Sequence, residues 1–141
     1  MSDLHSSLIP RGTPLPKTVR GKTRADEKDA RDRADKRDEA ACYALVDARD
    51  GLRCRVTGKA LVKGGGLTTR VERHHMISRG AGGPHASWNV VTVSKAIHDR
   101  IEVAGTMRLS GDADARDDSG RFCGVKVEEL INDVMTATRW V

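Results

Sequence analysis

The first third of the chain carries almost no apolar pattern. Residues 1–22 hold three of the four prolines and no helical or strand periodicity, so we expect a mobile tail there. From residue 23 to 50 proline is absent, and acidic and basic side chains recur four positions apart. The pairs are Glu27 with Arg31, Asp29 with Arg33, and Asp32 with Lys36. Each such pair stabilises a helix by about 0.2–0.5 kcal/mol, so the pattern predicts a solvated, charged helix over 23–50.

The middle of the chain, residues 51–105, alternates short apolar stretches with turn residues. Three short strands are predicted, over residues 52–56, 67–74 and 89–93. Several glycines between the second and third strands indicate an irregular loop. Ser94 is a suitable N-cap for a helix that ends near Glu102, because Ile97 and Ile101 would lie on one face of it.

The last segment, residues 106–141, is predicted to add a small strand–helix extension. Strands are expected at 107–109 and 125–127, followed by a final helix from about Glu128 in which Trp140 would anchor the core. The acidic residues between the two strands fit a solvated turn, because their spacing does not match a calcium loop. Together the segments predict an α+β fold in which a charged helix precedes a central core and a C-terminal extension.

The charge of the chain favours an anionic partner. The formal net charge is +5 and the isoelectric point is about 9.4. Eight Lys or Arg residues and only two acids lie between Arg49 and Arg79. A solvated surface would account for the same count, but a locally positive segment is also what phosphate binding requires.

Cysteine usage and hydropathy bear on the compartment. The three cysteines form no C-x-x-C pair, so we expect neither a disulfide framework nor a four-cysteine zinc ribbon. No stretch approaches the roughly 18 apolar residues that a membrane span needs, and the N-terminus lacks a signal-peptide pattern. We therefore expect a soluble cytoplasmic protein, in the host cytoplasm if a phage encodes it, with no membrane partner.

Histidines gather in the central segment. Four of the five lie between positions 74 and 98, and His74 and His75 are adjacent at the end of a predicted strand. Neighbouring strand residues point to opposite faces, so one imidazole can bind a metal while the other faces a substrate. Two strand-end histidines with only local hydrogen bonds are the simpler explanation of the pair alone. The further spacing to Asn89 and then to His98 makes a catalytic set the better hypothesis.

Residues 52–104 resemble the HNH nuclease family. The matching stretches are RVERHHMISRGAGG, WNVVTV and SKAIHDRI. The resemblance implies a ββα-metal core over 51–105 with one divalent metal ion, and Mg, Mn, Zn and Ni all fit this expectation. It implies an endonuclease that hydrolyses nucleic acid, with double-stranded DNA as the expected partner, and leaves 5′-phosphate and 3′-hydroxyl ends. Compact nucleases of this kind are frequent in phage genomes.

The resemblance also implies a role for each residue of the set. His74 and His98 would be metal ligands, and His75 would be the general base for the attacking water. Asn89 would tie together the loop backbone and so orient the base. Glu102 is a candidate third ligand, because it lies one helical turn after His98. A solvated helix-end carboxylate is an equally good interpretation of Glu102.

One feature of many relatives is missing. They hold the unit together with four zinc-binding cysteines, and only Cys54 stands at such a position here. No structural zinc is therefore expected at that place, and Val56, Leu61 and Ile97 are expected to pack there instead.

Arg73 and Arg79 flank the histidine pair and are the candidates for phosphate contact. His85, in the glycine-rich loop, is expected to be exposed rather than a ligand. Two other functions stay open at this point. One is a non-catalytic nucleic-acid-binding module with an HNH-like fold, and the other is a protein-interaction arm formed by the charged helix beside an inactive nuclease.

Overall fold

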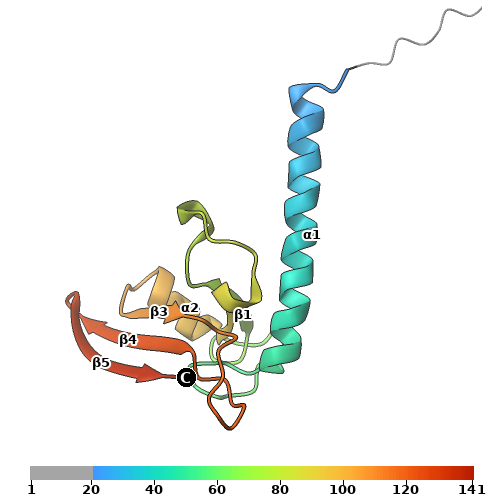
Figure 1. The fold of residues 1–141 in the computed structure, drawn as a ribbon. Helices are drawn as coiled ribbons and strands as arrows, with labels where there is room; N and C mark the ends of the chain where they lie inside the picture. Colours follow the sequence, from blue (N-terminus) through green and yellow to red (C-terminus); the bar gives the residue numbers. More distant parts are fainter. Residues whose placement is uncertain (1–20) are drawn as a thin grey trace, which may run out of the picture.

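The computed structural model describes residues 21–141 and has an α+β architecture, as predicted (Figure 1). The elements in chain order are α1 (Arg24–Asp50), β1 (Val71–His75), the 3-10 turns η1 (Arg79–Ala81) and η2 (Ser87–Asn89), β2 (Val90–Ser94), α2 (Lys95–Glu102), β3 (Met107–Gly111), β4 (Val125–Ile131) and β5 (Val134–Trp140). The predicted tail lies outside the described residues except for Gly21 and Lys22. Neither described helix combines the length and apolarity needed to cross a membrane.

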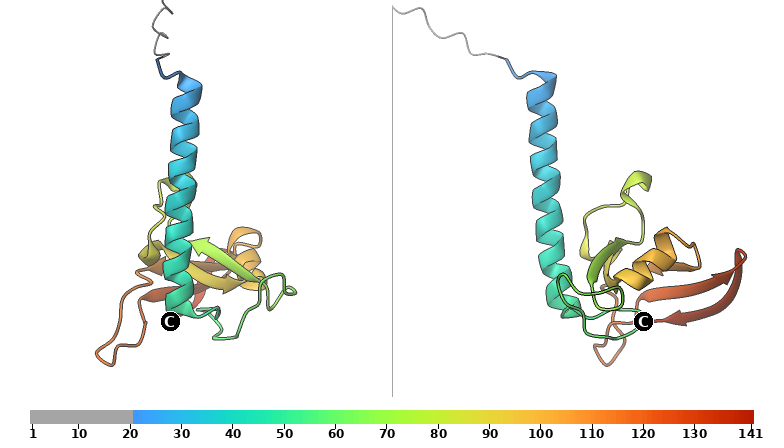
Figure 2. Two further views of the ribbon diagram at one scale, coloured as in Figure 1. Left: turned by 90° about the vertical axis from the view of Figure 1, so that its right-hand side faces the viewer. Right: turned by 180° about the vertical axis from the view of Figure 1, so that it is seen from behind.

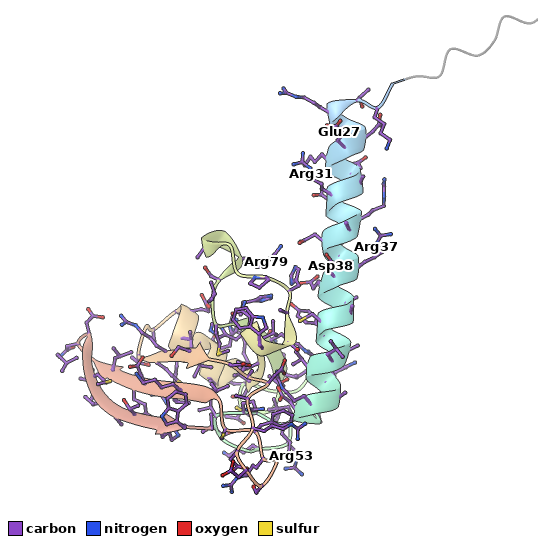
Figure 3. The ribbon with its side chains drawn as sticks, in the orientation of Figure 1. Glu27, Arg31, Arg37, Asp38, Arg53 and Arg79 are labelled. Atoms are coloured by element: carbon purple, nitrogen blue, oxygen red, sulfur yellow. The ribbon has the colours of Figure 1, made fainter. Side chains whose placement is uncertain are left out.

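Helix α1 confirms the predicted charged helix. Thr23 caps it, and the side chain of Asp26 bonds back to the cap in a capping box. Its N-terminal part stands clear of the rest of the molecule in all views, and the labelled Glu27 and Arg31 lie there (Figures 1, 2 and 3). Its C-terminal part docks through Cys42 and Val46, which pack on Val90 of β2. The helix is therefore packed into the core only near its C-terminal end.

The central segment forms an antiparallel hairpin followed by a helix. β1 pairs with β2 in a register that places His74 opposite Val91 and His75 opposite Val90. Ser94 caps α2 through its side chain, as predicted. The strand expected over 52–56 is wrong: backbone hydrogen bonds from Cys54 to Lys59 and from Gly58 to Cys54 close a turn there, leaving only an isolated bridge. The predicted strand over 67–74 begins only at Val71.

The predicted C-terminal helix is also wrong. Strands β3, β4 and β5 form a second antiparallel sheet, in that order. The two residues that join β4 to β5 are Asn132 and Asp133, both at positive φ, as a tight two-residue hairpin turn requires. Trp140 lies on the edge strand and is 61% exposed, so it does not anchor the core.

The main core is an apolar cluster that includes the three residues expected to pack together. Val56, Leu61 and Ile97 are buried in one cluster with Cys54, as expected. The cluster continues into the second sheet through four further buried side chains, Met107, Leu109, Val125 and Val127. Apolar contacts therefore join the β1–β2 hairpin, α2 and the three-stranded sheet into one body.

Candidate metal centre and catalytic site

His74, His98 and Glu102 meet at one point between β1 and α2. One potential ligand atom of each lies within 4.8 Å of the others. Nδ1 of His74 is 3.2 Å from a carboxylate oxygen of Glu102, and the two imidazole rings lie edge to face with centroids 5.8 Å apart. His98 and Glu102 share a face of α2 because they are one turn apart. The structure thus brings all three predicted ligands together.

The three side chains suit a divalent cation. Burial lowers the pKa of His74 to about 4, despite the opposing influence of Glu102, so its imidazole is neutral and can donate a lone pair near pH 7. Donor atoms about 2.1 Å from one ion lie at most about 4.2 Å apart, and the 4.8 Å limit on the separations in this group is only slightly wider. Two imidazoles and a carboxylate also leave positions for water and substrate.

His75 lies beside this group on the other side of the strand end. Both histidines line a hollow of about 300 Å³, together with Glu102, Arg108 and Ser110 among others. Nε2 of His75 lies 3.1 Å from Nδ1 of His85, whereas Nδ1 of His75 has no hydrogen-bond partner within residues 21–141. Burial, followed by the nearby His85 and Arg79, holds the pKa of His75 below its usual value. A neutral imidazole with one free nitrogen can accept a proton.

Asn89 braces the loop that follows the histidine pair. Its side chain is fully buried. Its oxygen accepts a hydrogen bond from the backbone N–H of Ile77 at 2.7 Å, and its amide donates to the carbonyls of Ile77 and Pro84 at 3.0 and 3.1 Å. These bonds close the loop from His75 to His85 against β2. The contact is of the kind that the resemblance implies, while a part in catalysis stays a prediction.

Two residues beside His75 were not found from the sequence. The side chain of His85 is only 6% exposed, so the expectation of an exposed loop histidine is wrong. Its Nε2 lies 3.4 Å from a carboxylate oxygen of Asp35, in the middle of α1. No periodicity or motif links positions 35, 75 and 85, because the loop has no regular pattern and the part of α1 around Asp35 reads as a solvated helix.

The basic side chains near the site differ in their exposure and in whether they form ion pairs. Arg73 pairs with Asp47, lies over the ring of Tyr43 and is 14% exposed. Arg79 lies in the loop facing α1 (Figure 3), pairs with Asp35 and is 45% exposed. Arg108 is exposed, lines the hollow and makes no ion pair with a described residue. Arg108 was missed because it belongs to β3, outside the segment that resembles the nucleases.

No family model, curated protein or solved structure matches this chain. Within the described range, His74, His98 and Glu102 are the one group of three or more His, Cys, Asp or Glu side chains gathered closely enough to hold a metal ion. That group, with His75 at the same hollow, is the functional site that the structure offers.

Proposed function

We propose that the protein is a metal-dependent endonuclease with an HNH-type ββα core, and that it hydrolyses phosphodiester bonds in nucleic acid, with DNA as the expected substrate. The observation that carries the proposal is one hollow bordered by two kinds of group. One is the group of His74, His98 and Glu102, whose potential ligand atoms lie within 4.8 Å of one another and of which His74 and Glu102 line the hollow. The other is His75, which also lines the hollow and whose Nδ1 has no hydrogen-bond partner within residues 21–141.

The reaction needs a base, a bound phosphate and a stabilised leaving group. His75 takes a proton from water, the water oxygen attacks phosphorus, and the bond from phosphorus to the 3′ oxygen breaks. The departing oxygen takes a proton from solvent, which leaves a 3′-hydroxyl and a 5′-phosphate. A divalent cation on His74, His98 and Glu102 would supply charge neutralisation at the phosphate and the leaving oxygen. A base whose pKa lies below its usual value is already deprotonated at neutral pH.

Substrate binding is assigned to the more exposed basic side chains near the site. Arg108 lines the hollow and Arg79 lies in the loop after His75, and we assign both to phosphate contact; the positive net charge of the chain supports an anionic substrate. Arg73 contributes positive potential from the strand, although its guanidinium is already paired with Asp47. The expected affinity is sensitive to salt and largely independent of base sequence.

The proposal is tested with supercoiled plasmid DNA and purified protein in Mg²⁺, Mn²⁺, Zn²⁺ or Ni²⁺. We expect nicked or linear DNA with at least one of the ions and intact plasmid in excess chelator. A His74→Ala/His98→Ala double variant purified in the same way controls for a contaminating nuclease and should be inactive. If the protein binds DNA but cleaves with none of the ions, it is a non-catalytic nucleic-acid-binding module instead.

A further inference from the structure

A series of three contacting side chains leads from His75, the proposed base, to the middle of α1. Nε2 of His75 lies 3.1 Å from Nδ1 of His85, and the two rings meet edge to face with centroids 5.1 Å apart. The far nitrogen of His85, Nε2, lies 3.4 Å from Oδ2 of Asp35. Each member thus contacts the next through a single pair of atoms.

The two residues beyond His75, His85 and Asp35, are held by other parts of the fold. His85 follows Pro84, whose carbonyl accepts a hydrogen bond from the buried Asn89, and the His85 side chain is almost fully buried. Asp35 belongs to a helix anchored by the buried Cys42 and Val46. A buried imidazole that touches a carboxylate on one side and a second imidazole on the other is held in place.

The carboxylate of Asp35 determines which ring nitrogens of His85 and His75 carry the protons. A carboxylate only accepts hydrogen bonds, so Nε2 of His85 must carry the proton that faces Asp35. Nδ1 of a neutral His85 is then a lone pair, and it can only accept. Nε2 of His75 must therefore donate to it, which leaves the lone pair of His75 on Nδ1. This is the same nitrogen that has no partner among the described residues.

We propose that Asp35 and His85 are positioning residues for the reaction: through the 3.4 Å contact of Asp35 with His85 and the 3.1 Å contact of His85 with His75, they hold His75 in the form whose Nδ1 accepts the proton from water. The inference rests on the proposed function, and it gives the charged helix a part in the site. Deleting α1 would therefore impair catalysis for a reason unrelated to DNA binding. A contact that only holds the loop would leave the tautomer of His75 and the chemical step unaffected.

The first test measures DNA cleavage by the full chain under saturating metal. His85→Ala and Asp35→Ala should each lower kcat about tenfold, which is the usual scale for groups that orient a reacting side chain. The double variant should be no slower than the slower single variant, because both changes interrupt the same series of side-chain contacts. Asp35→Asn keeps an oxygen that accepts from His85 and should recover most of the rate.

Two matched variants separate positioning from binding. Asp38→Ala removes the same charge from the neighbouring turn of α1, where it has no hydrogen bond or ion pair with a described residue, and should cleave like the parent. Arg79→Ala removes the other partner of Asp35 and should raise KM more than it lowers kcat. Additive losses in kcat for Asp35→Ala and His85→Ala, or parental kcat in both, would overturn the proposal while leaving the nuclease activity standing.

The second test does not require activity. Nitrogen-15 NMR of the full chain in Mg²⁺ buffer, at a pH where both rings are neutral, reports which nitrogen of His75 and His85 carries the proton. We expect the Nε2–H form for both rings in the parent and a mixture of forms in Asp35→Ala. An Nδ1–H form of either ring in the parent contradicts the proposal even if the protein cleaves DNA. If both rings show the expected Nε2–H form but the protein does not cleave DNA, the proposed nuclease activity is refuted and the positions of the protons are not.

Discussion

Two groups of polar side chains flank the β1–β2 hairpin, and they differ in how completely their hydrogen bonds are satisfied. On the α1 side, the buried carboxylate of Asp50 accepts two bonds from Arg49, one from Arg55 and one from the backbone N–H of Thr92. Arg49 also donates to two backbone carbonyls of the segment leading into β2. Burial raises the pKa of the Asp50 carboxyl, but its bonds to Arg49 and Thr92 outweigh that effect and leave the pKa below its usual value.

The group of His74, His98 and Glu102, on the other side of the hairpin, has fewer of its hydrogen bonds satisfied. His74 is as well buried as Asp50, yet its one close polar contact is with the half-exposed Glu102. One potential ligand atom of each of His74, His98 and Glu102 lies within 4.8 Å of the others, and each of these residues can offer a lone pair to a cation there. A group in which every charge is paired stabilises the fold, whereas converging lone pairs at the edge of a hollow are suited to binding a cation.

The largest expected effect comes from a substitution in the fully hydrogen-bonded group around Asp50. Asp50→Ala leaves Arg49 and Arg55 buried without their partner, and removing one member of a buried pair costs about 3–5 kcal/mol. We expect the free energy of unfolding, measured by urea denaturation and circular dichroism, to fall by that amount. Asp47→Ala is the matched control, because it breaks a more exposed pair with Arg73 and should cost about 1 kcal/mol or less. Equal losses for the two variants would remove the distinction between the groups.

The group of His74, His98 and Glu102 should respond to metal. A ligand that binds only the folded state at 100 times its Kd raises the free energy of unfolding by about 2.7 kcal/mol. We expect a gain of this order for the parent in Mn²⁺, none in chelator, and none for His74→Ala. Asp118→Ala, which removes an exposed carboxylate far along the chain, should keep the full gain. An equal gain in His74→Ala would mean that the ion binds elsewhere.

Local signals in the sequence predicted the elements on which the site is built. The spacing of opposite charges gave α1, and the Ser94 cap with Ile97 and Ile101 gave α2, because these signals act within one or two helical turns. The three candidate ligands could be grouped because two of them share a helix face. How close His98 and Glu102 lie to His74 depends on the register in which β1 and β2 pair.

Signals that depend on contacts between distant segments were missed. The stretch from Glu128 to Met135 has apolar residues at helical spacing, and that pattern hid the Asn132–Asp133 turn, although a two-residue turn of this composition is a hairpin signal. Asp35 looks like any other acid of a charged helix. Its approach to His85 follows from the docking of α1 on β2, which no local pattern encodes.

A smaller effect separates the accessible basic residues from the engaged one. We expect Arg79→Ala and Arg108→Ala each to reduce the slope of log affinity against log salt by about 0.9, one lost phosphate contact. Arg73→Ala should change the slope less, because its side chain is only 14% exposed and lies over the ring of Tyr43, whereas that of Arg79 is 45% exposed. The measurement is fluorescence anisotropy with a short DNA duplex at several salt concentrations. A slope that falls only in Arg73→Ala would place the DNA along the strand rather than around the hollow.

The central claim is that His75 acts on the substrate while its neighbour His74 binds the cation. The measurement that tests it most directly compares His75→Ala with the parent in two assays, plasmid cleavage and Mn²⁺ binding by calorimetry. We predict that cleavage falls by about 10² or more, as expected for loss of a general base, while the Kd for Mn²⁺ stays near the parental value. A variant that cleaves as fast as the parent, or that loses Mn²⁺ binding along with cleavage, would contradict this division of roles.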